Sequence, residues 1–133
     1  MTQYIGALAL LVPDYDSAID YYTQVLGFTL KEDTPMGPDK RWVVVSPPGA
    51  QECDIILAKA KNASEQASIG NQTGGRVFLF LHTDDFWRDY NRYRAQGVRF
   101  LEAPREEPYA TVAVFQDALG NRWDLLEKKQ VLP

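Results

Sequence analysis

The feature that most constrains this fold is one pattern of segments that occurs twice along the chain. A strand, an amphipathic helix and three further strands are predicted over about residues 4–59, and the same order is predicted over about residues 76–127. The helix of such a βαβββ unit covers one face of its sheet and leaves the other face bare. Two units can bury these faces against each other or curl around a cleft. We therefore expect an α+β fold in which residues 1–133 form a single domain of two modules.

Corresponding residues mark the ends of the two predicted helices. Asp14 and Asp85 stand where the helices begin, and an aspartate there accepts hydrogen bonds from the first turn. Gly27 and Gly97 stand where the apolar helix face ends. The segment between the modules, 60–75, is polar and ends in two glycines. It is predicted to be a connector with at most a weak helix.

The remaining segments are short runs rich in β-branched and aromatic residues, which are typical of strands. The predicted strands are 4–12, 28–33, 41–46 and 53–59 in the first module and 76–82, 98–103, 111–117 and 122–128 in the second. The stretch PREEPYA, 104–110, is predicted to be a loop.

Composition excludes several classes of protein. Hydrophobic residues make up 45% of the 133 residues and charged residues 24%, which is typical of a globular domain rather than of disorder. The net charge of −4, with scattered Lys and Arg, argues against a nucleic-acid partner. No apolar run approaches the roughly 20 residues of a membrane helix, and the N-terminus lacks the features of a signal peptide. We expect no membrane partner and a cytoplasmic location.

The chain has one cysteine and one histidine. With Cys53 alone, neither an internal disulfide nor a cysteine-based zinc site is possible. With His82 alone, one chain cannot bind a metal through two imidazoles.

Two stretches, VPDYDSAIDYYTQVLGF and RFLEAPREEPYATVAVFQDALGNRWDLLE, resemble the vicinal oxygen chelate superfamily, which includes glyoxalase I, the extradiol dioxygenases and the bleomycin-resistance proteins. The resemblance covers about residues 4 to 127. Its landmarks are Asp14, Ala18, Tyr22, Leu26, Gly27, Phe28, Asp84, Asp85, Gly97, Phe115, Asp117, Gly120 and Asn121. The resemblance implies that the paired modules form an incomplete barrel around a cleft. It also implies a homodimer, because the family usually pairs its modules across a second chain.

The resemblance further implies four metal-ligand positions, often His on the first strand and Glu on the last strand of each module. They fall on Ala7 and Phe78, which cannot bind a metal, and on Asp54 and Asp124, which can. We therefore expect no metal cofactor. If a divalent metal is bound, Asp54 and Asp124 would hold it together with several waters, which suits Mg²⁺ or Mn²⁺ better than Zn²⁺, Ni²⁺ or Fe²⁺.

Asp54 and Asp124 are expected to be equivalent in the two modules, so strand alternation would direct both into the cleft. There they would contact a ligand, act as an acid–base pair, or serve only the structure. In the structural alternative each carboxylate pairs with Arg122, Arg76 or backbone amides, since a buried charge needs a partner.

Phe78 and Phe80 are expected to make the cleft apolar, beside Ala7 and Arg122. His82 follows Phe80 at even spacing and is expected on the same face, either as a catalytic base or as a residue that closes the strand. Most of the other aromatic residues are expected in the core; they are Trp42, Trp87, Trp123, Tyr109 and Phe115.

The function that these residues favour is the binding of a partly apolar small molecule, without the usual metal centre. The alternative is a divalent-metal-dependent lyase, isomerase or dioxygenase, similar to lactoylglutathione lyase, in which His82 and Asp124 would be catalytic. A third possibility is an interaction module whose cleft is filled by its own side chains.

Overall fold

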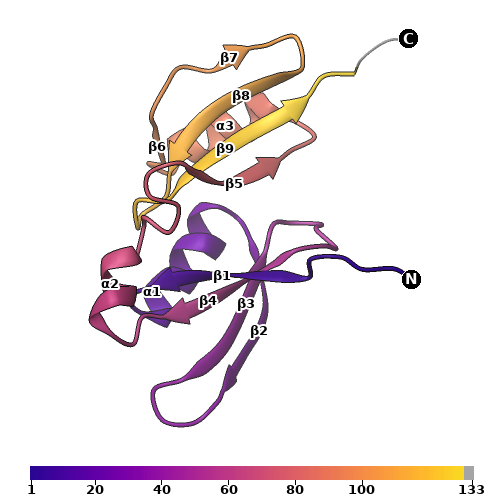
Figure 1. Ribbon diagram of the computed structural model, residues 1–133. Coiled ribbons are helices and arrows are strands. Elements are labelled where there is room, and N and C mark those ends of the chain that lie inside the picture. Colours follow the sequence, from indigo (N-terminus) through magenta and orange to yellow (C-terminus); the bar gives the residue numbers. More distant parts are fainter. Residues whose placement is uncertain (131–133) are drawn as a thin grey trace. The chain divides into compact units, whose positions relative to one another are not determined.

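The structure, a computed structural model that describes residues 1–130, divides into two units of the same topology between Ile69 and Gly70 (Figure 1). The first unit contains β1 (Ala7–Val12), α1 (Tyr15–Asp20), the π-helix η1 (Tyr21–Val25), β2 (Thr29–Pro35), β3 (Arg41–Ser46), β4 (Asp54–Lys59) and α2 (Ala63–Ser68). The second contains β5 (Val77–His82), α3 (Phe86–Ala95), β6 (Arg99–Phe100), β7 (Arg105–Glu106), β8 (Ala110–Gln116) and β9 (Arg122–Lys128).

The two sheets have equivalent strand orders, β1-β4-β3-β2 and β5-β9-β8-β6, with β7 paired to β8. In each sheet the first and last strands of the unit are parallel neighbours, and the other pairs are antiparallel. The predicted α+β class and the twofold βαβββ order are confirmed. The division between the units lies within the predicted connector, where the weak helix is α2.

Both long helices begin at the predicted aspartates. Asp14 Oδ2 accepts a hydrogen bond from the Ser17 amide at 2.9 Å, and Asp85 Oδ1 accepts one from the Arg88 amide at 3.1 Å. Each bond satisfies an amide that has no partner inside the helix. The first helix differs from a regular amphipathic helix in its second half, which is π-helical from Tyr21 to Val25.

The helix-covered face of each sheet carries the core. In the first unit this face presents Leu10, Val43, Val45 and Leu57, all fully buried. In the second unit aromatic rings join helix and sheet: Tyr93 of α3 contacts Phe115 of β8 edge to face, and Phe115 stacks on Trp123 of β9. Trp123 and Phe115 are core residues, as expected, whereas Trp42, Trp87 and Tyr109 are exposed, contrary to the expectation.

The strand predicted at 98–103 is reduced to Arg99–Phe100, and a short strand, β7, occupies part of the predicted loop. The pairing of the predicted strand 98–103 with β8 ends early because the Val114 amide of β8 donates to the Glu102 carboxylate at 3.1 Å. In a regular ladder this amide would donate to a backbone carbonyl. Pro104 then offers no amide hydrogen for a ladder. No helix within residues 1–130 is long and apolar enough to cross a membrane.

Candidate functional site

In each unit the candidate site is the sheet face that its helix does not cover. In the first unit, this face holds a hollow of about 260 Å³. It is lined by Ala7, Lys31, Glu32, Trp42, Val44, Asp54 and Ile56. The register places Ala7 beside Asp54 and Val44 beside Ile56. The hollow therefore combines an apolar floor with charged side chains at its rim.

A β-bulge supplies one of the charges. The register of β2 against β3 shifts between Leu30 and Glu32, which leaves Lys31 outside the regular ladder. The Lys31 ammonium nitrogen lies 3.0 Å from Asp54 Oδ1, two strands away in the sheet. Both side chains are partly exposed, so this ion pair contributes at most about 1 kcal/mol to stability. It nevertheless gives Asp54 a partner that the sequence did not suggest.

Trp42 forms an aromatic wall of the hollow. Its indole nitrogen donates to Glu32 Oε2 at 3.0 Å, and 37% of the residue remains exposed. The hydrogen bond orients a ring whose remaining surface is available for stacking. A flat apolar ligand could rest on this ring and on the floor while its polar atoms meet the rim.

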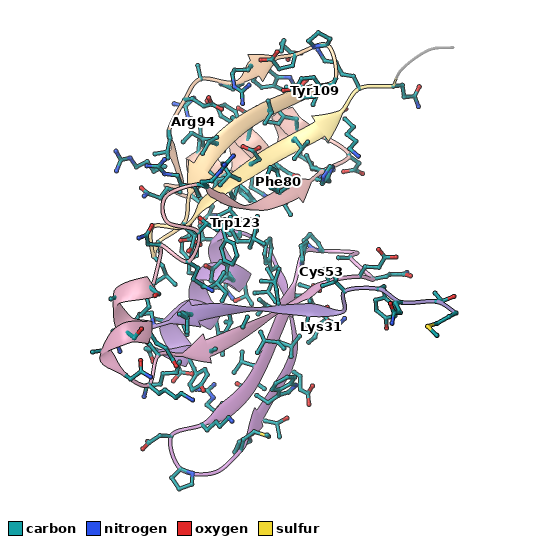
Figure 2. All side chains as sticks on the ribbon, viewed as in Figure 1. Lys31, Cys53, Phe80, Arg94, Tyr109 and Trp123 are labelled. Atoms are coloured by element: carbon teal, nitrogen blue, oxygen red, sulfur yellow. The ribbon has the colours of Figure 1, made fainter. Side chains whose placement is uncertain are left out.

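In the second unit the helix-free face is centred on Asp124. The register places Asp124 of β9 between Phe80 of β5 and Val114 of β8, so the three side chains share one face. Phe80, on β5 in Figure 2, is 60% exposed. The next row of the same face is formed by His82 and Leu126. An acid thus stands on a mostly apolar surface, beside an open aromatic ring.

Asp124 Oδ1 is buried and has no hydrogen-bond partner among the described residues. Burial raises the pKa of the Asp124 carboxyl group. The positive charge of Arg105 opposes this rise, and the negative charge of Glu102 adds to it. Asp124 therefore keeps its proton to a higher pH than an ordinary aspartate and, when protonated, can donate a hydrogen bond.

The raised pKa predicts a pH-dependent effect of Asp124→Asn. Above a pH of about 3.9, the pKa of an unfolded aspartate, the unfolded chain releases the Asp124 proton while the folded chain still keeps it. The free energy of unfolding therefore falls as the pH rises toward and through the higher pKa of the folded state. Asparagine does not ionise and avoids this loss. We expect Asp124→Asn to be more stable than the natural chain by about 1 kcal/mol at pH 7, with the gain disappearing near pH 3.

Urea unfolding at several pH values measures this difference. Asp54→Asn is the matched control, because Asp54 is paired with Lys31 and its replacement should bring no gain at neutral pH. A gain for Asp124→Asn that is the same at pH 3 and pH 7 would contradict the prediction.

Asp54 and Asp124 are not equivalent, contrary to the expectation from sequence. Asp124 pairs with Phe80, five residues before the helix-capping Asp85. The corresponding residue of the first unit, five before Asp14, pairs with Ile56. The two acids differ in position because the connection before β4 is two residues longer than the one before β9. The counterpart of Asp124 is therefore Ile56.

The sequence predicts that Phe78 shares a face with Phe80 and His82, but regular strand alternation is interrupted at this residue. The register of β5 shifts between Val77 and Leu79, which leaves Phe78 at a bulge without a partner on β9. Phe78 lines a different pocket of the second unit.

The structure brings together some of the other predicted site residues. Ala7 and Asp54 meet in the hollow of the first unit. Arg122 lies in the same pocket as Phe78, and its guanidinium donates to the Gly75 carbonyl rather than to Asp124. His82 shares the face of Asp124 but forms no side-chain hydrogen bond or ion pair with residues 1–130. Among the described residues, Asp124 pairs with neither Arg122 nor Arg76 of its own unit, two of the partners that the structural alternative named, and Asp54 pairs with Lys31.

The residues at the implied ligand positions do not fit a metal centre. With the register corrected, these positions hold Ala7, Ile56, Phe78 and Asp124, of which only Asp124 can bind a metal. Across the part of the chain that the structure describes, no three His, Cys, Asp or Glu side chains gather closely enough to hold an ion.

Sequence reasoning missed the charged residues that frame the two faces: Lys31, Glu32, Glu102 and Arg105. The bulge at Lys31 has no marker such as glycine or proline in the sequence. The acids Glu102 and Glu32 lie in segments with many charges, which are typical of solvent-exposed surfaces. Only the pairing of strands shows that these side chains act on Asp124 and Trp42.

Comparison with known proteins gives a consistent result over nearly the whole chain. The family model described as the Glyoxalase/Bleomycin resistance protein/Dioxygenase superfamily matches residues 4–125. An uncharacterised protein of Shewanella frigidimarina is 54% identical over 100% of this chain and 99% of its own length. YetH, an uncharacterised protein of Bacillus subtilis, is 31% identical over 96% of this chain and 100% of its own.

Solved structures that resemble nearly the whole chain include UcmS2 and TnmS3. UcmS2 matches with a TM-score of 0.81 and 30% identity, over 95% of this chain and 98% of its own. TnmS3, described as an antibiotic binding protein from Streptomyces sp. CB03234, matches with a TM-score of 0.76 and 28% identity, over 96% and 98%.

Proposed function

The chain belongs to the Glyoxalase/Bleomycin resistance protein/Dioxygenase superfamily, as the sequence resemblance predicted, and on this premise we propose that it binds a small, partly apolar organic molecule without a metal centre. The observation that carries the proposal is the chemistry of the helix-free sheet faces. Each has an apolar surface, an aromatic ring open to solvent and a carboxyl group, and three of the four implied metal-ligand positions cannot bind a metal.

The first unit offers a concave surface. A flat ligand in the hollow would stack on Trp42 and cover Ala7 and Ile56, while Lys31, Asp54 and Glu32 meet its polar atoms. Burial of about 200 Å² of apolar ligand surface contributes about 5 kcal/mol before the entropy cost of association is subtracted. The two carboxylates at the rim favour a ligand that carries a hydrogen-bond donor or a positive charge.

In the second unit, Phe80 would cover an apolar part of the ligand and Asp124 would bind a polar part. A carboxyl group with a raised pKa can act as donor or acceptor, so it suits neutral as well as cationic groups. The description of TnmS3 as an antibiotic binding protein supports the binding of an organic molecule as the function of this chain.

Proflavine, a planar aromatic cation, tests the proposal by fluorescence titration with the full chain. We expect saturable binding that EDTA does not weaken. Trp42→Ala should weaken binding by the first unit about tenfold, and Phe80→Ala should weaken binding by the second unit about tenfold, since the loss of one stacked ring costs about 1.4 kcal/mol. A loss in only one variant would assign the binding to that unit.

Trp87→Ala is the matched control. Trp87 is more open to solvent than Trp42 but lies on α3, among the rings of Phe86 and Tyr90 on the helix-covered side of its sheet. Its replacement should leave the affinity unchanged. Binding that EDTA abolishes, or that all three variants weaken alike, would refute the proposal.

A further inference from the structure

A pocket of about 280 Å³ lies in the second unit, where segment 70–76 meets the turn between β8 and β9. The side chains that line it are Asn71, Thr73, Arg76, Phe78, Gln116, Asn121 and Arg122. The two segments are in close contact, because a β-carbon added to Gly70 would lie 2.0 Å from the Leu119 carbonyl oxygen. This contact holds the glycine-rich segment against the turn and gives the pocket a defined wall.

The charge of the pocket is positive. Arg76 and Arg122 line it, and among residues 1–130 no Asp or Glu does. Neither guanidinium forms an ion pair with a residue that the structure describes, although Arg41 and Arg88 each bind two carboxylates. In a chain whose net charge is −4, two arginines without acidic partners on one pocket create a local positive potential that attracts an anion.

The geometry leaves donors available for that charge. Arg122 uses Nη1 to donate to the Gly75 carbonyl oxygen at 3.1 Å, which orients the guanidinium while its other N–H groups stay without a partner among the described residues. Arg76 uses none of its side-chain donors within residues 1–130. The side-chain amide of Asn71 adds a neutral donor at the rim.

We propose that this pocket binds an oxyanion, the phosphate or carboxylate group of a small ligand, between Arg76 and Arg122. The planar guanidinium presents paired N–H donors that match the oxygens of either group. The site goes beyond the proposed function, because its lining includes neither Asp124 nor Phe80 and shares no residue with the hollow around Trp42. Both arginines are solvent-exposed, so the affinity should fall as the salt concentration rises.

Titration of the full, ¹⁵N-labelled chain with inorganic phosphate, and separately with acetate, tests the proposal by NMR at constant ionic strength. We expect saturable shifts of amide signals confined to residues 70–76 and 116–122. If only phosphate saturates the shifts, the ligand carries a phosphate group, and if only acetate does, it carries a carboxylate. If both anions saturate them, the pocket accepts either group. Shifts that do not saturate with either anion would overturn the proposal.

The variants separate a site from general attraction. Arg76→Gln should weaken the anion affinity at least threefold, and the double variant with Arg122→Gln at least tenfold. Arg76 is the cleaner test, because its side chain has no hydrogen bond or ion pair to lose among the described residues. Arg99→Gln removes an exposed, unpaired arginine of the same unit outside the pocket and should change nothing. An equal loss in Arg99→Gln would overturn the proposal, whereas the outcome with proflavine does not bear on it.

Discussion

Replacement of Asp117 with Asn is expected to lower the free energy of unfolding by about 3 kcal/mol. Asp117 lies in the turn between β8 and β9, and only 5% of it is exposed. Its Oδ1 accepts the amides of Leu119 and Asn121, both at 3.0 Å, and its Oδ2 accepts Asn121 Nδ2 and the indole nitrogen of Trp123, also at 3.0 Å. An asparagine must turn its amino group toward one of these pairs of donors, which leaves buried N–H groups without an acceptor.

Urea unfolding measures the loss, and Asp84→Asn provides the control. Asp84 belongs to the same unit, but its carboxylate is exposed and, among residues 1–130, pairs only with Arg88 four residues later. Its replacement should change stability by about 0.5 kcal/mol or less. If Asp117→Asn cost no more than Asp84→Asn, the four hydrogen bonds would not be what holds the turn together.

Replacement of Gly70 with Ala is expected to destabilise the chain by at least 2 kcal/mol, on the order expected for backbone strain combined with a steric clash. The added β-carbon would lie 2.0 Å from the Leu119 carbonyl oxygen and 2.9 Å from its carbon, both backbone atoms that cannot turn away. Gly70 also has a φ of +73°, in the left-handed region that alanine avoids.

Gly74→Ala separates these two causes. Gly74 has nearly the same φ, +72°, but a β-carbon there would meet nothing within 4 Å. Its replacement should cost only the conformational penalty, about 1 kcal/mol. The difference between the two variants in urea unfolding measures the clash alone. Equal losses would show that the chain at Gly70 can move away from the turn at little cost.

Asp117 and Gly70 act on the same turn, and this turn sets where β9 begins. Trp123 enters the core beneath α3 when its indole nitrogen bonds to Asp117, so the next residue, Asp124, faces the opposite side of the sheet. The position of a candidate ligand-binding acid therefore depends on a buried carboxylate seven residues earlier in the chain. Weakening the turn should disturb ligand binding as well as stability.

Much of the architecture follows from local patterns in the sequence. The helix-capping aspartates and the glycine after each helix mark the same points in both halves, because capping involves residues only a few positions apart. Alternation along β9 correctly predicts that Trp123 faces the core and Asp124 the other face, since the period of a strand is a local property. The twofold order of strands and helices depends only on such short-range rules.

The tertiary structure decided which residues of different strands meet. A bulge shifts every later residue of a strand by one position, and neither the bulge at Lys31 nor that at Phe78 is marked in the sequence. The pairing of Lys31 with Asp54 and the equivalence of Asp124 with Ile56 follow from these shifts and from loop lengths. The sequence by itself determined the order of the elements and the face of each residue on a regular strand, because both depend on neighbours along the chain. Register between strands depends on contacts between distant segments, so the composition of the candidate sites emerged only with the folded sheets.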